Sequence, residues 1–218
     1  VDALAERLTK TFGGVDVLIN NAGLGDGGLF ECADPDKLDA VVQVNVLALT
    51  SLTRLLLPGM VARGRGGLLF VSSGYGLVWM PGMSVYVATK HYVTALSDAL
   101  RCELEGTGVV VSQLCPGPVA TEFEQVAFAG KDLTVPRFVQ ISAEACAHQG
   151  LRGLKRGRAL VIPGWKHRLM IGSYRLFPRP LMRLVGRCLG WMLRRIGGPD
   201  ARVSPEDTGS QPSSTRHR

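Results

Sequence analysis

Apolar side chains recur at helical spacing in the first twelve residues of the chain. Positions 1, 4, 5, 8 and 12 are apolar, so residues 1–12 are predicted to form an amphipathic helix. The next apolar run, residues 15–19, is short and β-branched, which predicts a buried parallel strand. This strand is expected to stop at the tight turn Asn20-Asn-Ala-Gly23.

Two further buried strands are predicted downstream. One ends at Val-Ser-Ser-Gly over residues 71–74, and the other covers residues 109–115 and is closed by Pro116-Gly-Pro-Val-Ala-Thr121. Taken alone, the turn over residues 20–23 could be an ordinary polar turn, and the turn over residues 116–121 could be a plain Pro/Gly turn. Buried strands of this kind are typical of an α/β protein with a parallel sheet, in which ligands bind where the strands end.

Ser73, Tyr86 and Lys90 carry side chains that can transfer a proton to a carbonyl group. The offset of four residues places Tyr86 and Lys90 on one face of a helix. A tyrosine with a pKa of about 10 needs a shift of roughly 3 units to act near neutral pH. An ammonium group about 4 Å away supplies an interaction of that order. Ser73 would donate a hydrogen bond to the substrate oxygen. Tyr86 alone could equally be a half-buried helix tyrosine.

Together these motifs resemble a short-chain dehydrogenase/reductase of the classical type, over roughly residues 1–164. The matches are Asn20-Asn-Ala-Gly23, Asn45 in Val-Asn-Val, the Ser73, Tyr86 and Lys90 set, and the turn over residues 116–121. By itself Asn45 could be a helix asparagine that points at solvent or marks a kink. The resemblance implies that Tyr86 is the general acid/base and that Lys90 lowers its pKa.

The same resemblance implies roles for the other motif residues. Ser73 would orient the substrate carbonyl, and Asn45 would hold a water molecule in a proton relay. The cofactor would be NAD(P), with NADP slightly favoured by the family. The cofactor-binding residues implied are Asn20, Ala22 and Gly23 at the adenine ribose side, Tyr86 and Lys90 at the nicotinamide ribose, and Pro116, Gly117, Val119 and Thr121 at the nicotinamide.

One family feature is missing from these 218 residues. Members of the family begin with a strand and a turn Thr-Gly-x-x-x-Gly-x-Gly whose amides meet the cofactor pyrophosphate. We therefore expect a doubly wound, Rossmann-type parallel sheet that lacks its first β-α-β-α-β half, with a C-terminal helical extension. Residues 1–164 would be the partial catalytic domain. The sequence is expected to be incomplete or mis-started, with a natural deletion product as the alternative.

The C-terminal part of the chain is strongly basic. Between Ala145 and Pro199 there are twelve Lys and Arg residues and no Asp or Glu. Residues 165–177 and 181–196 are predicted to form two amphipathic helices within a basic extension that covers residues 165–199. These helices could lie in an anionic membrane interface, or they could cap the substrate pocket. Nucleic acid is not expected as a partner, because no recognition module is present. Residues 200–218 are predicted to be disordered.

The scattered cysteines and histidines indicate neither disulfides nor a metal site. No unbroken apolar run approaches 18 residues, so no membrane span is predicted. These features favour a cytoplasmic protein, peripheral to the membrane if its basic helices bind lipid.

The predicted function is the interconversion of a carbonyl and an alcohol on an apolar, lipid-like or alicyclic, substrate. The apolar side chains expected around that substrate are Trp79, Met80, Met83, Phe123 and Phe128. The resemblance also implies a homo-oligomer that forms through the helices around residues 38–60 and 86–104. The alternative is a catalytically inactive, truncated protein that acts in membrane or partner binding.

Overall fold

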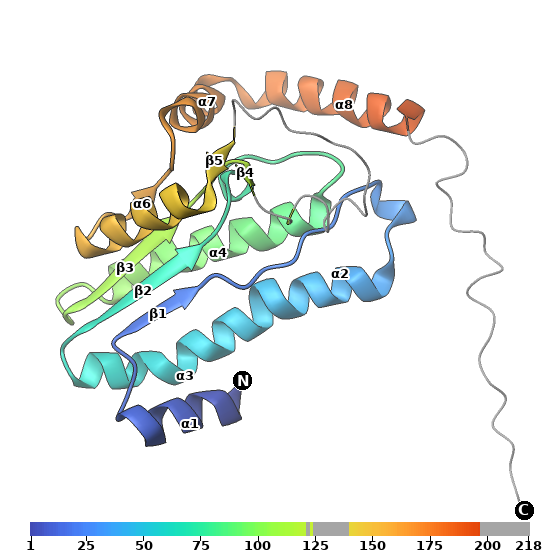
Figure 1. Ribbon diagram of the computed structural model, residues 1–218. Coiled ribbons are helices and arrows are strands. Elements are labelled where there is room, and N and C mark those ends of the chain that lie inside the picture. The colour runs from blue at the N-terminus through green and yellow to red at the C-terminus, as the bar shows by residue number, and fades with distance from the viewer. Residues whose placement is uncertain (121–122, 124–139, 197–218) are drawn as a thin grey trace, which may run out of the picture.

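The computed structural model describes residues 1–120, 123 and 140–196 (Figure 1). Thr121, Phe128 and residues 200–218, which carry expectations from the sequence, lie outside the described residues.

Parallel strands form a central sheet in the order β1-β2-β3-β6. Ile19 pairs with Leu69, Leu69 with Ser112, and Leu114 with Val161. Because all the strands run the same way, their carboxyl ends meet at one edge. The strands are β1 (Val17–Asn20), β2 (Gly66–Val71), β3 (Val109–Leu114) and β6 (Leu160–Val161), and a separate parallel pair consists of β4 (Val119–Ala120) and β5 (Ile141–Ser142).

The strand boundaries differ slightly from the expected ones. β1 begins at Val17 instead of residue 15 and extends to Asn20, because pairing with β2 starts where the Gly67 N–H donates to Asp16 O at 2.9 Å. The segment expected to be only a turn after β3 contains β4, in which Val119 pairs with Ile141.

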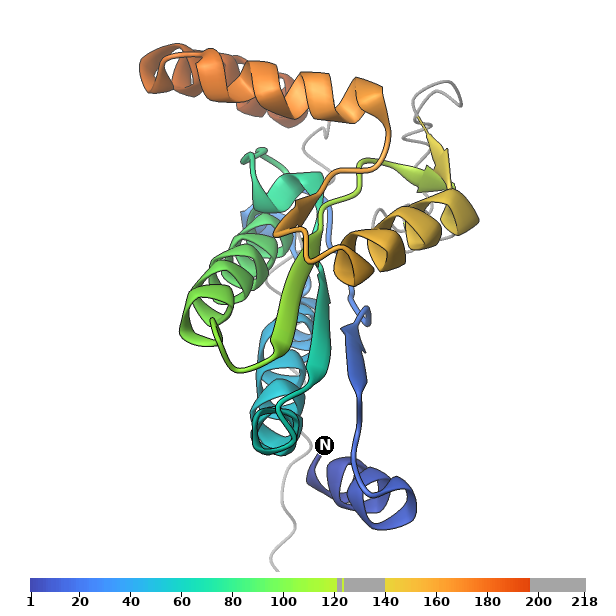
Figure 2. The same cartoon turned by 90° about the vertical axis from the view of Figure 1, so that its left-hand side faces the viewer.

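Helices cover both faces of the sheet (Figure 2). α3 and α4 lie on one face and α6 lies on the other, which confirms the predicted doubly wound, Rossmann-type α/β class. The helical elements of this body are α1 (Asp2–Phe12), η1 (Phe30–Cys32), α2 (Pro35–Val42), the π-helical η2 (Gln43–Ala48), α3 (Leu49–Ala62), η3 (Gly74–Gly76), α4 (Ser84–Glu103) and α6 (Ala143–Lys155).

β2 is buried on both sides, which explains its continuous apolar sequence. Leu68 and Phe70 point into a core shared with α3 and α4, where they join Val93. Leu69 points the opposite way and packs with Leu154 of α6. Because successive side chains of a strand point to opposite faces of the sheet, β2 contacts both helical layers.

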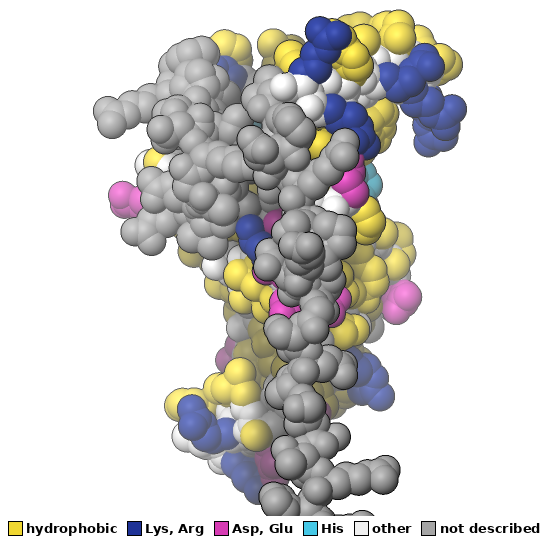
Figure 3. All heavy atoms as spheres, turned by 90° about the vertical axis from the view of Figure 1, so that its right-hand side faces the viewer, with side chains coloured by type: hydrophobic (Ala, Val, Ile, Leu, Met, Phe, Trp, Pro, Cys, Tyr) yellow, Lys and Arg dark blue, Asp and Glu magenta, His cyan; other side chains and the backbone are white. Residues whose placement is uncertain are grey.

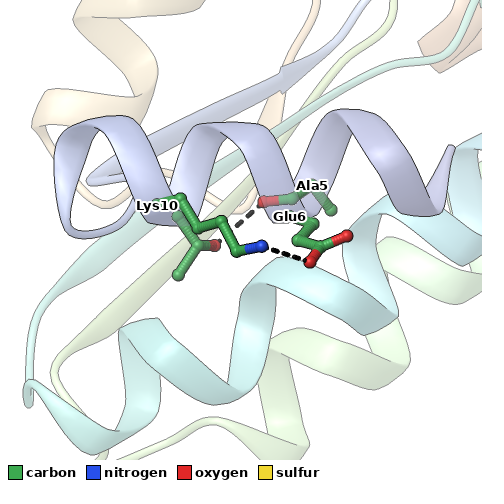
Figure 4. A network of polar contacts seen from close by, with 4 residues as sticks. Ala5, Glu6 and Lys10 are labelled. Carbon is green, nitrogen blue, oxygen red and sulfur yellow. Dashed lines mark hydrogen bonds and ion pairs between the residues drawn. The ribbon is translucent and has the colours of Figure 1, made fainter.

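α1 is the amphipathic helix expected at residues 1–12, and it packs beside α3. Its buried residue is Ala5, while Glu6 and Lys10 form an exposed ion pair at 2.7 Å (Figure 4). The Thr9 hydroxyl donates to Ala5 O at 2.9 Å. Gly13 ends the helix at φ 71°, a left-handed conformation that glycine adopts without strain.

α2, η2 and α3 form one continuous helix, Pro35–Ala62. Its N-cap is Asp34, whose side chain accepts a hydrogen bond from Asp36 N at 3.0 Å. By length and composition it is the one helix among the described residues that could cross a membrane. Its inner side, with Leu56 and Met60, belongs to the core against the sheet.

α7 (Trp165–Leu176) and α8 (Arg179–Ile196) lie across the edge at which the strands end (Figures 1 and 2). They confirm the predicted C-terminal helical extension. α8 begins at Arg179, two residues before its expected start, because the first turn of a helix tolerates a proline such as Pro180.

Replacing Phe70 by alanine should lower the free energy of unfolding by about 3–5 kcal/mol, because it opens a cavity in a fully buried position. The matched control is Phe30→Ala. Phe30 is 63% exposed, so its loss should change stability by less than about 0.5 kcal/mol. Urea unfolding followed by circular dichroism measures both. Equal losses in the two variants would contradict the assignment of Phe70 to the core.

Candidate active site

The polar motifs of the sequence meet at the carboxyl edge of the sheet. Asn20 is the last residue of β1, Ser73 follows β2, and Pro116 follows β3. The two turns after β2 and β3 are joined, since Ser72 N donates to Leu114 O at 2.9 Å and the N–H of the residue after Ser73 donates to Pro116 O at 2.7 Å. These backbone bonds fix the turns relative to each other.

Tyr86 and Lys90 enter this edge from α4. Both side chains are buried, and Lys90 Nζ donates to Val71 O, at the end of β2, at 3.0 Å. Lys90 Nζ lies 5.7 Å from the centroid of the Tyr86 ring, and the Ser73 hydroxyl forms a hydrogen bond with Tyr86. The structure therefore brings together the serine, tyrosine and lysine that the sequence singled out.

Aromatic rings enclose the Tyr86 phenol. The Tyr75 ring packs edge-on against it with centroids 6.3 Å apart, and the Phe123 ring lies at 5.6 Å. Met83 is buried in the same cluster, and Met80 packs against it. Burial of this kind removes water from around the phenol.

Loss of solvation controls the acidity of both groups. Burial raises the pKa of Tyr86 to about 12, while the hydrogen bond with Ser73 opposes the rise and Tyr75 adds to it. Burial also lowers the pKa of Lys90 to about 8, partly offset by Cys115. The expected lowering of the Tyr86 pKa by Lys90 is therefore absent, because the same desolvation disfavours the charged form of each group.

Asn45 lies inside the protein and not on its surface. Its side chain is 1% exposed, in the π-helical turn η2. Asn45 Oδ1 accepts from Leu24 N at 2.8 Å, and Nδ2 donates to Leu24 O at 2.9 Å and to Thr89 Oγ1 at 3.0 Å. Thr89 Oγ1 in turn donates to Tyr86 O at 2.7 Å. Asn45 thus joins the loop after β1 to the helix that carries Tyr86.

The loop after β1 approaches the lysine closely at Gly23. A Cβ atom at Gly23 would lie 3.3 Å from Lys90 Nζ and 3.4 Å from Asn45 Oδ1. Only a residue without a side chain leaves this space beside the ammonium open. Asn20 is anchored by its Nδ2, which donates to Thr53 Oγ1 at 3.0 Å, whereas Ala22 is exposed.

The turn after β3 is covered by α7. The ring of His167 packs directly onto Gly117, where any Cβ atom would overlap it. Pro116 and Val119 flank this contact along the chain, and Thr121 lies outside the described residues. His167 is 3% exposed, and its Nε2 has no hydrogen-bond partner among the described residues. Burial lowers the pKa of His167.

Several supporting residues were not predicted from the sequence. Ser72 Oγ donates to Lys90 O at 3.0 Å and shares a hydrogen bond with Thr94. Gly76 sits so close to this pair that a side chain there would overlap both hydroxyls. The available signal was the spacing of small polar residues around the Ser-Tyr-Lys set. For His167 no signal distinguishes it from a surface histidine.

Comparison with known proteins agrees with this geometry. A family model for short chain dehydrogenases matches residues 1–132. The chain belongs to the short-chain dehydrogenase family. This confirms the family recognised from the motifs and the Rossmann-type fold.

Three relatives illustrate the match. The ketoacyl reductase HetN from Nostoc sp. is 40% identical over 120 residues, which cover 55% of this chain and 42% of that protein. A D-beta-hydroxybutyrate dehydrogenase from Cupriavidus necator is 38% identical over 125 residues, covering 57% and 48%. A solved short-chain dehydrogenase from Sphingobium yanoikuyae, in complex with NADPH, is 29% identical with a TM-score of 0.68, covering 80% and 68%. The chain spans about half the length of the curated relatives it matches.

The Lys90→Met variant should be more stable than the wild type by about 2 kcal/mol at pH 7. A pKa lowered from 10.5 to about 8 means that the folded state penalises the charge below pH 8. The lost hydrogen bond to Val71 offsets part of this gain. Because the unfolded state binds more protons between pH 8 and 10.5, the wild-type free energy of unfolding rises in this range. The difference in stability between Lys90→Met and the wild type should therefore become smaller.

Unfolding by urea at pH 7, 8, 9 and 10 measures this gap. Tyr86 is present in both proteins, so its own titration cancels. Lys155→Met, at an exposed position on α6, is the control and should show no pH-dependent gap. A gap that stays constant with pH for Lys90→Met would contradict the buried charge.

Proposed function

We propose that the protein is an NAD(P)-dependent oxidoreductase that interconverts a carbonyl and an alcohol, with Tyr86 as its general acid/base. The observation that carries this proposal is the convergence of Ser73 and Lys90 on the buried Tyr86 at the carboxyl edge of the sheet. Asn45, in η2, donates a hydrogen bond to Thr89 of α4, the helix that carries Tyr86.

The described residues fit a nicotinamide cofactor at this edge. Lys90 has three N–H donors, and one of them bonds Val71 O, so the others can bond the hydroxyls of a ribose. The open space at Gly23 lies directly beside that ammonium. We assign Asn20, Ala22 and Gly23 to the adenine ribose side, Tyr86 and Lys90 to the nicotinamide ribose, and Pro116, Gly117, Val119 and Thr121 to the nicotinamide, with NADP slightly favoured.

A bound nicotinamide supplies the hydride for the carbonyl carbon. Tyr86 donates its phenolic proton to the carbonyl oxygen, and the Ser73 hydroxyl donates a hydrogen bond to the same oxygen. A phenol whose pKa is near 12 is protonated at neutral pH, which is the form needed for carbonyl reduction. The Lys90 ammonium lies 5.7 Å from the centroid of the ring that then carries the negative charge. In the opposite direction the phenolate accepts the proton of the alcohol.

Asn45 is assigned to the proton relay that restores the Tyr86 proton. Its amide is fixed by two bonds to Leu24 and one to Thr89, and the second lone pair of Oδ1 can accept a hydrogen bond from a water molecule. The π-helical turn is the local distortion that aims this side chain inward.

An apolar, lipid-like or alicyclic, substrate is favoured by the surroundings of Tyr86. Met83 and Val87 are buried beside it, and Tyr75, Met80 and Phe123 pack against them. Side chains of this kind exclude water and offer few hydrogen bonds to a sugar.

A homo-oligomer is favoured by an apolar groove on the outer side of α2, η2 and α4. Its lining includes Val42, Val46 and Val85, and Leu47 is 51% exposed nearby along the chain. We also place the protein in a reducing compartment such as the cytoplasm, because its five cysteines are free.

The second candidate is a catalytically inactive protein that acts in membrane or partner binding. The absence of Asp and Glu from residues 145–199 and the exposed apolar side chains of α8 favour it.

Tyr86→Phe should lower kcat for carbonyl reduction at least about a hundredfold, the scale of general acid catalysis. The control is Tyr92→Phe on the same helix, where the hydroxyl bonds only the half-buried Thr50 in the described residues and activity should stay within about twofold. Steady-state NADPH oxidation with a series of apolar ketones measures both.

Turnover of Tyr86→Phe near the wild-type level would remove Tyr86 from the chemistry. If a folded protein that also carries the N-terminal Thr-Gly-x-x-x-Gly-x-Gly half turns over none of these ketones with NADPH or NADH, the inactive candidate is favoured instead.

A further inference from the structure

One side of α8 is held against the body of the protein. The Trp79 ring packs so closely on Gly186 that a Cβ atom there would overlap it. Leu193 contacts Gly82, where a Cβ atom would lie 2.9 Å from its Cδ1. Arg194 forms an ion pair with Glu31 of η1. These three contacts join six residues from three segments and define how α8 is rotated about its axis.

This rotation leaves another side of α8 facing away from the protein. The residues on it recur at helical spacing and are between 42% and 57% exposed: Leu181, Leu184, Val185, Trp191 and Met192. We call this set the outer face of α8. Five large apolar side chains in three turns, with no covering element among the described residues, form a patch of the kind that marks an interaction site.

α7 adds apolar surface at the same end of the molecule. His167 and Ile171 form its buried side, whereas Trp165, Leu169 and Met170 are 55–71% exposed. Figure 3 shows hydrophobic and basic side chains side by side over the end of the molecule that carries α8.

The charge around the outer face has one sign. Residues 145–199 contain no acidic residue, and Arg183 and Arg187 lie one turn apart on α8, between the outer face and the side that contacts Trp79. Arg195 stacks on Trp191, with its guanidinium carbon 3.8 Å from the ring centroid. Arginine and tryptophan side by side suit a membrane interface, where the ring enters the lipid and the charge meets phosphate.

We propose that the outer face of α8 docks on an anionic lipid bilayer, with α8 lying in the plane of the interface. A bilayer accepts apolar side chains without requiring a matching shape, and an anionic headgroup layer attracts the basic residues beside them. This surface goes beyond the proposed reaction, because it needs neither cofactor nor substrate.

A second copy of the chain fits the outer face less well. In a two-fold contact the same patch meets itself, which would bring the arginines of both copies together without an acidic residue of α8 between them. Like charges placed opposite each other at an interface are unfavourable.

The test is cosedimentation of the 218-residue chain with vesicles, without cofactor or substrate. Vesicles of phosphatidylcholine mixed with phosphatidylglycerol should carry down more protein than phosphatidylcholine alone, and added salt should weaken binding. Leu184→Ser with Met192→Ser should weaken it about tenfold. The control is Leu4→Ser with Leu151→Ser, a pair of similar exposure on α1 and α6, and it should bind like the wild type.

The arginines are tested separately. Arg183→Gln with Arg187→Gln should weaken binding to the anionic vesicles by about fivefold for each residue near the surface, without changing binding to phosphatidylcholine.

Equal sedimentation with both vesicle types, or none with either, would overturn the proposal. So would gel filtration in which Leu184→Ser with Met192→Ser converts an oligomer of the wild type into a smaller species, since the outer face would then be a contact between copies. Loss of catalysis by Tyr86→Phe has no bearing on these results.

Discussion

Lys90 carries an ammonium group into a position that is 5% exposed, and this group must be satisfied by the protein. The partner is Val71 O, the last carbonyl of β2, at 3.0 Å. α4 must therefore pass directly over the end of β2, and the rest of the site follows from that crossing. Tyr86 lies one turn earlier on the same side of α4, and Ser73 lies two residues after Val71.

The close crossing requires small and polar residues where the backbones meet. Ser72 Oγ reaches Lys90 O, and it bonds Thr94 Oγ1 one turn further along α4. Gly76 fills the remaining space, since any side chain would overlap these groups. Close packing at this point excludes water, and this exclusion disfavours the charged forms of both side chains, the Tyr86 phenolate and the Lys90 ammonium. The packing that stabilises the fold therefore disfavours the ionised side chains that proton transfer needs, a conflict that is common at active sites.

Much of this arrangement could be predicted from the sequence, and the failures have physical causes. The helix at residues 1–12 was predicted from its apolar period, and the strand β3 from its run of valines followed by a Pro/Gly turn. β4 and β6 each have two residues, too few for any period. The π-helical turn that buries Asn45 depends on hydrogen bonds with Leu24, a contact across 21 residues. Local sequence could therefore name Asn45 as a helix residue but could not say which way it points.

For the site residues too, local features could be predicted from the sequence and long-range contacts could not. The offset between Tyr86 and Lys90 is a local property of one helix, so the sequence predicts that they share a side. The direction of their pKa shifts depends on how completely the surrounding segments exclude water, which only the folded arrangement reveals. His167 comes to Gly117 from a helix 50 residues away, and no pattern near either residue anticipates the contact.

The contact between Gly186 and Trp79 has a thermodynamic consequence. Trp79 lies in the segment that leads into α4, four residues before the buried Met83, so any movement of α8 away from the body would remove a contact from that segment. A surface that favours the seated α8 would then favour the ordered segment beside Tyr86. Linkage requires the reverse effect to have the same size: a molecule that orders the Met83 segment would tighten, by an equal factor, the binding of any partner that prefers the seated α8.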